Sequence, residues 1–475
     1  MRSFNINDKE LPIPSFFQVY NYGGGAGDKC REIVYANLTK DTPALVNYYY
    51  LNNNYPHTFQ SKKLNDISKF HSIGDIFNYV RKSLIEDDHN IYVNYSLPEY
   101  DFNQKIFLLD SGASQIVKYI AKEIDYNKEA FLSVFIQHMV AYYDFADRYK
   151  FDLVVGFDLG GKYTFKDGEA DKKLIQFYNS LDKDEINYTI LKSTIDYLKT
   201  KPNFYPKVLA TIHGKTPNDY KQYTLKTLEL EKSSGYSFWG FALGGIASSK
   251  NADESWSNGI DFSKTKKKFV SDAVIPARAS YIVHSIVGDR PIHALGGGGY
   301  PNILLNSWCG ATSFDAASPA RRVGDGNALS TGYVFDKNAP KKLNGADVSF
   351  SKLFVGGVNF DGTLRDESFE YLDLNKVDNN FTLCGCPACE IAKTVIALKE
   401  LYASKSGNDE ATYFSRQLMN IHAIWQHRLL CQIISKYTAT EFIEKYGQDN
   451  LFSRLLLILE QIKRMINLHP FLICQ

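Results

Sequence analysis

Residues 291–315 read PIHALGGGGYPNILLNSWCGATSFD, and this stretch contains one complete strand–helix–strand unit. An apolar run, Pro291–Leu295, precedes four consecutive glycines and predicts a strand that ends in a turn. Asn302–Cys309 has the apolar spacing of a helix, and Ala311–Phe314 is a second short apolar run. Two strands joined by a helix indicate a parallel pair with a crossover connection.

The same unit recurs from residue 105 onward, which indicates a parallel sheet with crossover helices. With two early strands, of which Ala44–Tyr50 is one, the strand count approaches eight. That number favours a closed (β/α)8 barrel of the TIM type, and an open doubly wound sheet is the alternative. The remaining predicted strands are Lys105–Leu109, Asp152–Phe157, Lys207–Ile212 and Phe238–Leu243, and the predicted helices are Gln115–Ile124, Asp171–Leu181, Asp184–Lys199, Asn218–Leu230, Phe269–Val287 and Asn302–Cys309.

Composition limits the class of protein. The 475 residues carry a formal net charge of +1, so any site for a polyanion must be a local patch. The first residues lack an apolar signal core, and the run Leu455–Leu459 is too short to span a bilayer. Seven cysteines, three of them clustered, do not indicate a secreted disulfide scaffold. We expect a soluble, cytoplasmic protein without membrane contact.

Carboxylates follow three of the predicted strands, at Asp110, Asp158 and Asp315. In a barrel the carboxyl ends of the strands meet at one face, where catalytic residues lie. A single aspartate after a strand is more often a loop-opening cap, but three at one mouth predict a site. Two facing carboxylates suit glycosidic-bond chemistry, in which one attacks or stabilises the sugar and the other moves the proton.

Histidine and glycine follow other strands. His213-Gly214 follows residues 207–212, Gly244-Gly245 follows residues 238–243, and Gly296–Gly299 follows residues 291–295. Glycines allow a flat ligand to approach the backbone closely. His213 is either a ligand contact or a histidine satisfied by the scaffold.

A metal-type cluster, Cys384-Gly385-Cys386-Pro387-Ala388-Cys389, is followed much later by Asn420-Ile421-His422. Three thiolates and one imidazole form the ligand set of a closed structural zinc site. The alternatives are a cluster of buried or redox-active cysteines, and His427 in place of His422. With helices expected near 390–404, 410–435, 439–446 and 450–467, we predict a barrel domain with an N-terminal lead-in over 1–380 and a zinc-bound helical subdomain over 381–475.

Several of these segments, in this order over roughly residues 105–430, resemble motifs of the tRNA-guanine transglycosylase family. They are Leu109–Gln115 (LDSGASQ), Phe157-Asp158, Gly240–Ala247 (GFALGGIA), the glycine run at Gly296 followed by Ser313–Arg321 (SFDAASPAR), and the cysteine cluster with Asn420–His422.

The resemblance implies a role for each motif. Asp315 is expected as the nucleophile at C1′ of a guanosine, Asp110 as the general acid and base, and Asp158 as the partner of the Watson–Crick edge of the base. No redox or pyridoxal cofactor is implied, and a homodimer is suggested. The remaining implied residues are Ser111, Gly112, His213, Gly244 and Gly245 around the base, Arg321 at phosphate or sugar, and Cys384, Cys386, Cys389 and His422 on a structural Zn2+.

The chain departs from the family pattern around the base. His213 stands where the family has glutamine, Ser114 where it has phenylalanine, and Leu159-Gly160 where it has Glu-Cys. These departures resemble the divergent branch that acts on DNA and exchanges guanine for a 7-deazaguanine such as preQ0. The basic run Lys264–Lys268 is a candidate phosphate contact or a solvated helix entry.

Three other functions stay open from the sequence. The first is guanine exchange in tRNA within queuosine-type modification. The second is a glycosidase or nucleosidase that uses the same carboxylates without an incoming base. The third is a non-catalytic partner subunit, against which the retention of Asp110, Asp158 and Asp315 argues.

Overall fold

The structure is a computed structural model. It describes residues 2–20, 31–52, 67–87, 99–160, 169–246, 254–261, 267–316, 352–354, 371–373, 420–421, 424–425, 427–446 and 451–467.

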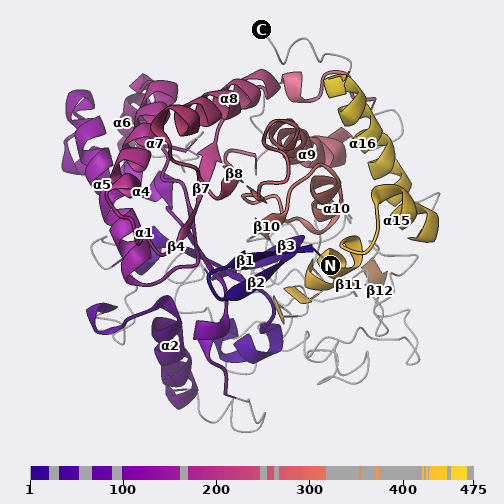
Figure 1. Cartoon of the computed structure of the whole chain (residues 1–475), viewed down its shortest axis with the longest axis horizontal. Helices are drawn as coiled ribbons and strands as arrows, with labels where there is room; N and C mark the ends of the chain where they lie inside the picture. Colours follow the sequence, from indigo (N-terminus) through magenta and orange to yellow (C-terminus); the bar gives the residue numbers. More distant parts are fainter. Residues whose placement is uncertain are drawn as a thin grey trace.

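Parallel strands close into an eight-stranded barrel (Figure 1). Each strand pairs with the next in chain order, and β10 pairs with β3 to close the ring. This arrangement confirms the predicted α/β barrel and rules out the open sheet. The strands are β3 (Ser15–Tyr20), β4 (Ala44–Asn47), β5 (Phe107–Asp110), β6 (Leu153–Val155), β7 (Lys207–Ile212), β8 (Gly240–Leu243), β9 (Ile292–Ala294) and β10 (Ser313–Ala316).

Helices surround the barrel and connect its strands from β5 to β10 (Figure 1). Helix α5 is not predicted from the sequence above, although Asn127 caps it by accepting hydrogen bonds from the N–H groups of Glu129 and Ala130. The helices of the ring are α4 (Ala113–Glu123), α5 (Lys128–Arg148), α6 (Glu169–Ser180), α7 (Lys183–Lys199), α8 (Pro217–Ser234), α9 (Lys267–Val287) and α10 (Tyr300–Trp308).

The end of β4 differs from the sequence prediction. Residues 48–50 do not continue the strand but form the short helix α1 (Tyr48–Leu51). The ring of Tyr48 packs edge-on against Tyr142 and Phe145 of α5, with ring centroids 5.2 and 5.0 Å apart. Packing between aromatic rings therefore overrides the strand propensity of the tyrosines. The turn leaves Asn47 as the last residue of its strand.

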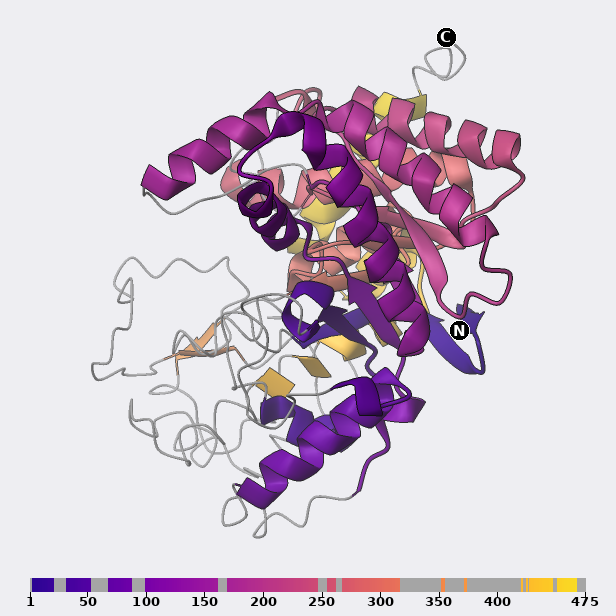
Figure 2. The ribbon, with the colours of Figure 1, turned by 90° about the vertical axis from the view of Figure 1, so that its left-hand side faces the viewer.

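Smaller elements lie outside the ring. Figures 1 and 2 show α2 (Ile73–Asp87) below the barrel, where it contacts two 3-10 helices, η2 (Arg31–Thr39) and η5 (Phe102–Gln104). Short 3-10 turns also occur at η3 (Ile67–Lys69) and η7 (Glu254–Trp256). Strands β11 (Lys352–Phe354) and β12 (Tyr371–Asp373) pair in a separate antiparallel ribbon. Within the described residues, no helix is both long and apolar enough to cross a membrane.

The hairpin of β1 (Arg2–Ile6) and β2 (Lys9–Ile13) closes the amino-terminal end of the barrel. Ile6 and Leu11 join the apolar cluster that fills the barrel interior, together with residues such as Leu108. Lys9 Nζ donates to the carbonyl of Lys105 and to Asp152 Oδ2, at 2.8 and 2.9 Å, just ahead of β5 and β6. Among the described residues, the hairpin thus covers this end of the barrel, and the strands finish at the opposite end.

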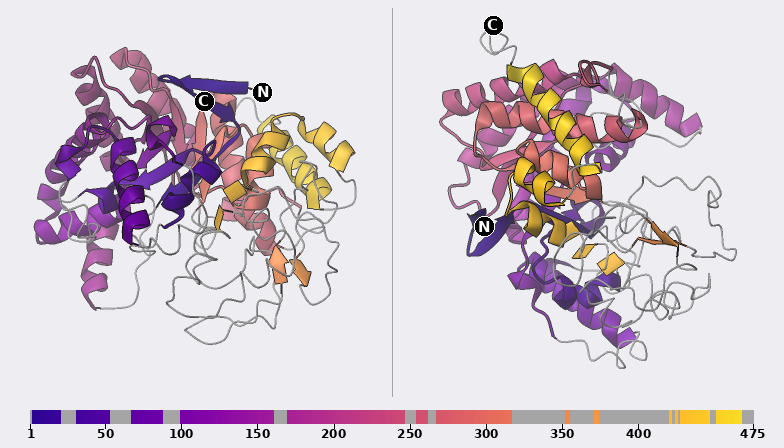
Figure 3. Two further views of the ribbon diagram at one scale, coloured as in Figure 1. Left: turned by 90° about the horizontal axis from the view of Figure 1, so that it is seen from below. Right: turned by 90° about the vertical axis from the view of Figure 1, so that its right-hand side faces the viewer.

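The carboxyl-terminal helices α15 (Ala439–Tyr446) and α16 (Leu451–Asn467) pack on the ring beside α9 and α10 (Figure 3). Trp308 at the end of α10 meets Phe442 of α15 with ring centroids 5.6 Å apart. Arg428 forms an ion pair of 2.7 Å with Asp41, and the ring of His427 lies 4.5 Å from that of Phe16 on β3. The described carboxyl-terminal helices thus share the core of the barrel domain, and the predicted boundary at 380 falls among residues outside the described part.

Candidate active site

Polar side chains gather at the carboxyl ends of the barrel strands. Parallel strands in one closed ring bring these ends to one face, although the residues are far apart in sequence. The three predicted carboxylates all lie at this face, and the charges of Asp158 and Asp315 act on Asp110. The residues at the strand ends are Asn47 on β4, Asp110 on β5, Asp158 after β6, His213 after β7, Gly244 after β8, Gly296 after β9 and Asp315 on β10.

Asp315 is held through one of its two carboxylate oxygens. The N–H of Gly296 donates to Oδ1 at 2.7 Å, and Nε2 of His293 lies 3.3 Å from the same oxygen. Gly298 also donates its N–H to the backbone carbonyl of Asp315 at 2.8 Å, which fixes the strand end against the glycine run. Within the described part of the chain, both hydrogen bonds to this carboxylate go to Oδ1. Oδ2 is therefore the carboxylate oxygen that is available to react.

Asp110 is poised to exchange a proton near neutral pH. Burial first, and then the charges of Asp158 and Asp315, together raise its pKa to about 7, against the opposing N–H groups of Gly112 and Ser111. Asn47, its register partner on β4, donates from Nδ2 to Asp110 Oδ2 at 3.0 Å. A carboxyl group with a pKa near the working pH suits general acid and base catalysis.

Asp158 lies on the loop after β6, and its side chain is largely buried. Burial raises its pKa to about 7, and the N–H of Gly160 donates to its Oδ2 at 2.9 Å. Asn187 of α7 accepts the N–H of Leu159 at 2.8 Å and so anchors the loop to the helix ring. The carboxyl group is therefore presented on a fixed backbone with little water around it.

His213 faces Asp158 across a small cavity that both residues line. Its Nε2 lies 3.3 Å from Asp158 Oδ2 but is not aligned as a hydrogen bond, and it has no hydrogen-bond partner among the described residues. The side chain is buried, with 8% of its surface exposed, and burial lowers its pKa to about 4. A buried polar atom of this kind needs a partner, such as a water molecule or a ligand atom.

Two of the glycines at the strand ends are closely packed against their neighbours. A side chain at Gly244 would meet the His213 ring at 3.1 Å, and Tyr220 donates its hydroxyl to the Gly244 carbonyl. Gly112 has a φ of +67° and lies against Asn47, so the turn after Asp110 needs glycine. Gly245 is exposed and a Cβ there would meet nothing within 4 Å, so the structure gives it no packing role. Ser111 is buried beside Asp110.

Sequence reasoning missed three residues of the site, Asn47, His293 and Ser313, and it did not foresee that the N–H of Gly296 donates to Asp315. Asn47 follows an apolar run. It would be identified as a strand-end residue if the predicted strand ended at residue 47 rather than 50. His293 and Ser313 lie inside β9 and β10, where alternation points them into the barrel. No sequence signal ties them to Asp315 before the pairing of the strands is known.

Other predicted residues lie outside the described part of the structure. These are Arg321, the zinc ligands Cys384, Cys386, Cys389 and His422, and most of the basic run Lys264–Lys268; the side chain of Ser114 is also not described. Among the residues that are described, no group of three or more His, Cys, Asp or Glu side chains could hold a metal ion.

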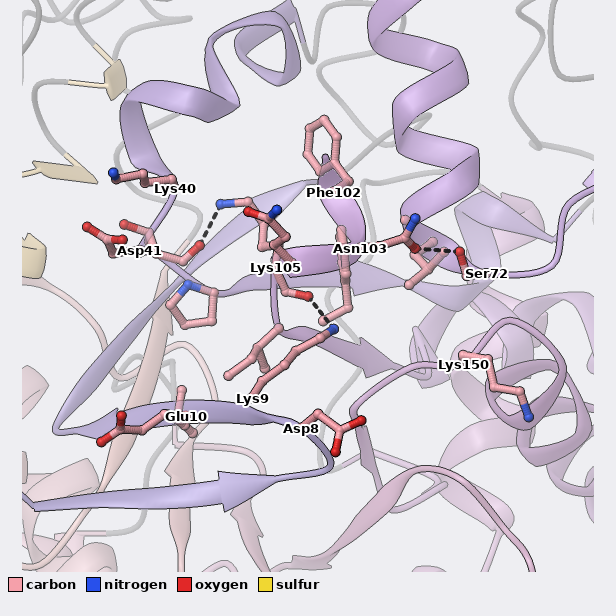
Figure 4. A pocket seen from close by; sticks show the side chains of 18 of the residues that line it. Asp8, Lys9, Glu10, Lys40, Asp41, Ser72, Phe102, Asn103, Lys105 and Lys150 are labelled. Carbon is pink, nitrogen blue, oxygen red and sulfur yellow. Dashed lines mark hydrogen bonds between the residues drawn. The ribbon is translucent and has the colours of Figure 1, made fainter. Parts of the chain in front are cut away.

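A separate cavity of about 850 Å³ lies at the plugged end of the barrel. Figure 4 shows Lys9 and Lys105 in its wall, joined by the hydrogen bond from Lys9 Nζ to the Lys105 carbonyl. The buried Lys105 Nζ donates to the carbonyls of Thr39 and Thr42 at 2.9 and 2.6 Å, and burial lowers its pKa to about 7. Lys105 thus satisfies carbonyls at the end of η2 and before β4, which is a structural role.

Comparison with known proteins adds no relative to this description. A scan against models of protein families finds no match, and a search of curated proteins finds no significant match. The site and the sequence motifs therefore provide the evidence for a function.

Proposed function

We propose that the protein exchanges guanine in a polynucleotide for a 7-deazaguanine such as preQ0, through a covalent intermediate between Asp315 and the sugar. One observation carries the proposal: a carboxylate held by one oxygen and a carboxyl group with a pKa of about 7 share one barrel mouth. These are the nucleophile and the proton carrier of a double displacement with retention of configuration.

The proposed reaction balances as two displacements. Asp315 Oδ2 attacks C1′, the bond from C1′ to N9 breaks, and the leaving guanine takes a proton from Asp110. The incoming base then returns its N9 proton to Asp110 and attacks C1′, which releases Asp315 as a carboxylate. The base must leave the helical stack to reach this mouth.

Asp158 and His213 are the proposed contacts to the edge of the base. Their polar atoms lie 3.3 Å apart in a buried wall, and His213 Nε2 has no partner within the described residues. With a neutral imidazole and a carboxyl group side by side, the wall offers both a donor and an acceptor to a guanine-type edge. Gly244 lies directly beside the imidazole, where a Cβ would meet the His213 ring at 3.1 Å.

We lean towards DNA rather than tRNA as the polynucleotide, on the resemblance of the His213, Ser114 and Leu159-Gly160 departures to the DNA-directed branch. The test is incorporation of labelled guanine into tRNA and into double-stranded DNA, side by side, with purified protein. Label in DNA supports the proposal as stated, and label in tRNA alone returns the protein to queuosine-type modification. Release of guanine without any incoming base would instead identify a hydrolase.

A structural Zn2+ held by Cys384, Cys386, Cys389 and His422 belongs to the same proposal. The donor set of three thiolates and an imidazole fits tetrahedral zinc, whose binding would stabilise the fold and take no part in the reaction. His427 stays the alternative to His422 as the fourth ligand.

A further inference from the structure

Three side chains on neighbouring strands form a hydrogen-bonded chain that ends at Asp315. His293 on β9 lies opposite Ser313 on β10, and Ser313 and Asp315 share one face of their strand. The Ser313 hydroxyl lies 2.8 Å from His293 Nδ1, and His293 Nε2 lies 3.3 Å from Asp315 Oδ1. The His293 ring is 1% exposed and meets Phe17 of β3 edge-on at 5.3 Å.

The chemistry of these three side chains determines which of them donate and which accept the hydrogen bonds. An ionised Asp315 can only accept a hydrogen bond, so His293 must carry a proton on Nε2. In the neutral ring Nδ1 is then an acceptor, and the Ser313 hydroxyl donates to it. Ser313 thus selects the tautomer of His293, and the tautomer in turn presents a donor to Asp315.

We propose that His293 is a positioning residue for Asp315: with the N–H of Gly296 it holds Oδ1, so that Oδ2 faces the sugar. This role rests on the proposed function. In the sugar ester, the same two donors would bind the carbonyl oxygen Oδ1. When the incoming base forms its bond to C1′, the bond from C1′ to Oδ2 breaks and its electron pair returns to a carboxylate that these donors stabilise.

Three variants test the hydrogen-bonded chain through their rates of base exchange. His293→Gln keeps a donor that reaches as far as Nε2, His293→Phe keeps only the ring that packs on Phe17, and Ser313→Ala removes the group that selects the tautomer. We expect kcat to fall about 10²-fold in His293→Phe, about 10-fold in Ser313→Ala and less than 10-fold in His293→Gln. The KM for the incoming base should change less than about threefold, since His293 does not line the base wall.

Two controls separate positioning from folding. The exposed His71 offers His71→Gln as a matched substitution, which should leave kcat unchanged. The thermal unfolding midpoint of each variant shows whether the barrel is intact. If His293→Phe is folded and exchanges base at the wild-type rate, the inference is wrong; rescue of the rate by His293→Gln but not by His293→Phe supports it.

A measurement on the resting protein decides the question even if no base exchange is found. Nitrogen NMR of the histidine side chains, with His293 assigned from His293→Gln, should show the tautomer protonated on Nε2. Asp315→Asn should shift the His293 signals, and Ser313→Ala should mix the two tautomers. If neither substitution changes the His293 signals, the inferred hydrogen-bonded chain is wrong. Absence of base exchange in the wild type would count only against the proposed function.

Discussion

Asn47 and Asp110 lie opposite each other at the ends of β4 and β5, and the Asn47 amide donates from Nδ2 to Asp110 Oδ2 at 3.0 Å. The amide occupies one carboxyl oxygen, so the exchangeable proton belongs on the other. An N–H donor favours the ionised form, whereas burial and two neighbouring carboxylates favour the protonated form. The balance places the pKa of Asp110 at about 7.

The release of guanine should therefore depend on pH around neutrality. Asp110 must carry a proton to give it to the leaving base, and the protonated fraction falls as pH rises through about 7. We expect the single-turnover rate of adduct formation to fall above that pH. Asn47→Ala removes a hydrogen-bond donor to the ionised form of Asp110. It should shift this limb of the pH–rate profile, the fall in rate, to higher pH by about 0.5–1 unit, the equivalent of about 1 kcal/mol.

Asp110→Asn provides the control for this profile. It should be slow, by about 10²–10⁴-fold, and its residual rate should lack the limb near neutral pH. A limb that persists in Asp110→Asn would assign the titration to another group. A limb that Asn47→Ala leaves in place would show that the amide does not set the pKa of Asp110.

Asp315→Asn should abolish the covalent adduct and base exchange. The amide cannot attack C1′, yet it can still accept hydrogen bonds at Oδ1 from Gly296 and His293, so the fold should persist. The measurement is a protein–polynucleotide adduct that survives denaturing electrophoresis. Asp196→Asn, at an exposed position on α7, is the matched control and should form the adduct normally. An adduct in Asp315→Asn would place the nucleophile elsewhere.

The barrel could be predicted because its signal is local. A short apolar run such as Lys207–Ile212 predicts a strand, and the helical pattern after it predicts a helix, each from a few neighbouring residues. The repetition of this pair indicates a parallel sheet. Asp110 and Asp315 are readable in the same way, next to the ends of apolar runs, although the end of β4 at Asn47 is not. The partners of these carboxylates were not, because partnership depends on strand register. Asn47 is separated from Asp110 by 63 positions, and only the pairing of β4 with β5 brings them together.

His213 should contribute to binding of the incoming base rather than to the chemical steps. It lines the wall with Asp158, and one neutral hydrogen bond is worth about 0.5–1.5 kcal/mol, so His213→Ala should raise KM about 3–10-fold with little change in kcat. Burial lowers the pKa of His213 to about 4, so the ring itself stays neutral above about pH 5.

His213→Gln is the informative companion to that variant, because glutamine restores an amide donor and acceptor at the same place. It should recover most of the affinity for the incoming base. A large loss of kcat in His213→Ala, with KM unchanged and the protein folded, would move His213 from base recognition into the reaction itself.

Removal of the proposed zinc should loosen the carboxyl-terminal helices first. We expect metal analysis of the purified protein to find zinc and Cys386→Ala to lose it, with a lower unfolding midpoint, because binding of a structural metal is coupled to folding. Helix α16 packs on α9 and α10 through buried residues such as Leu455 and Ile462, so its amide protons should lose protection before those of β5 to β7. Cys309→Ala removes a buried thiol at the end of α10 and should keep the zinc, which separates loss of metal from loss of packing. Wild-type protein without zinc, or Cys386→Ala that retains it, would contradict the site.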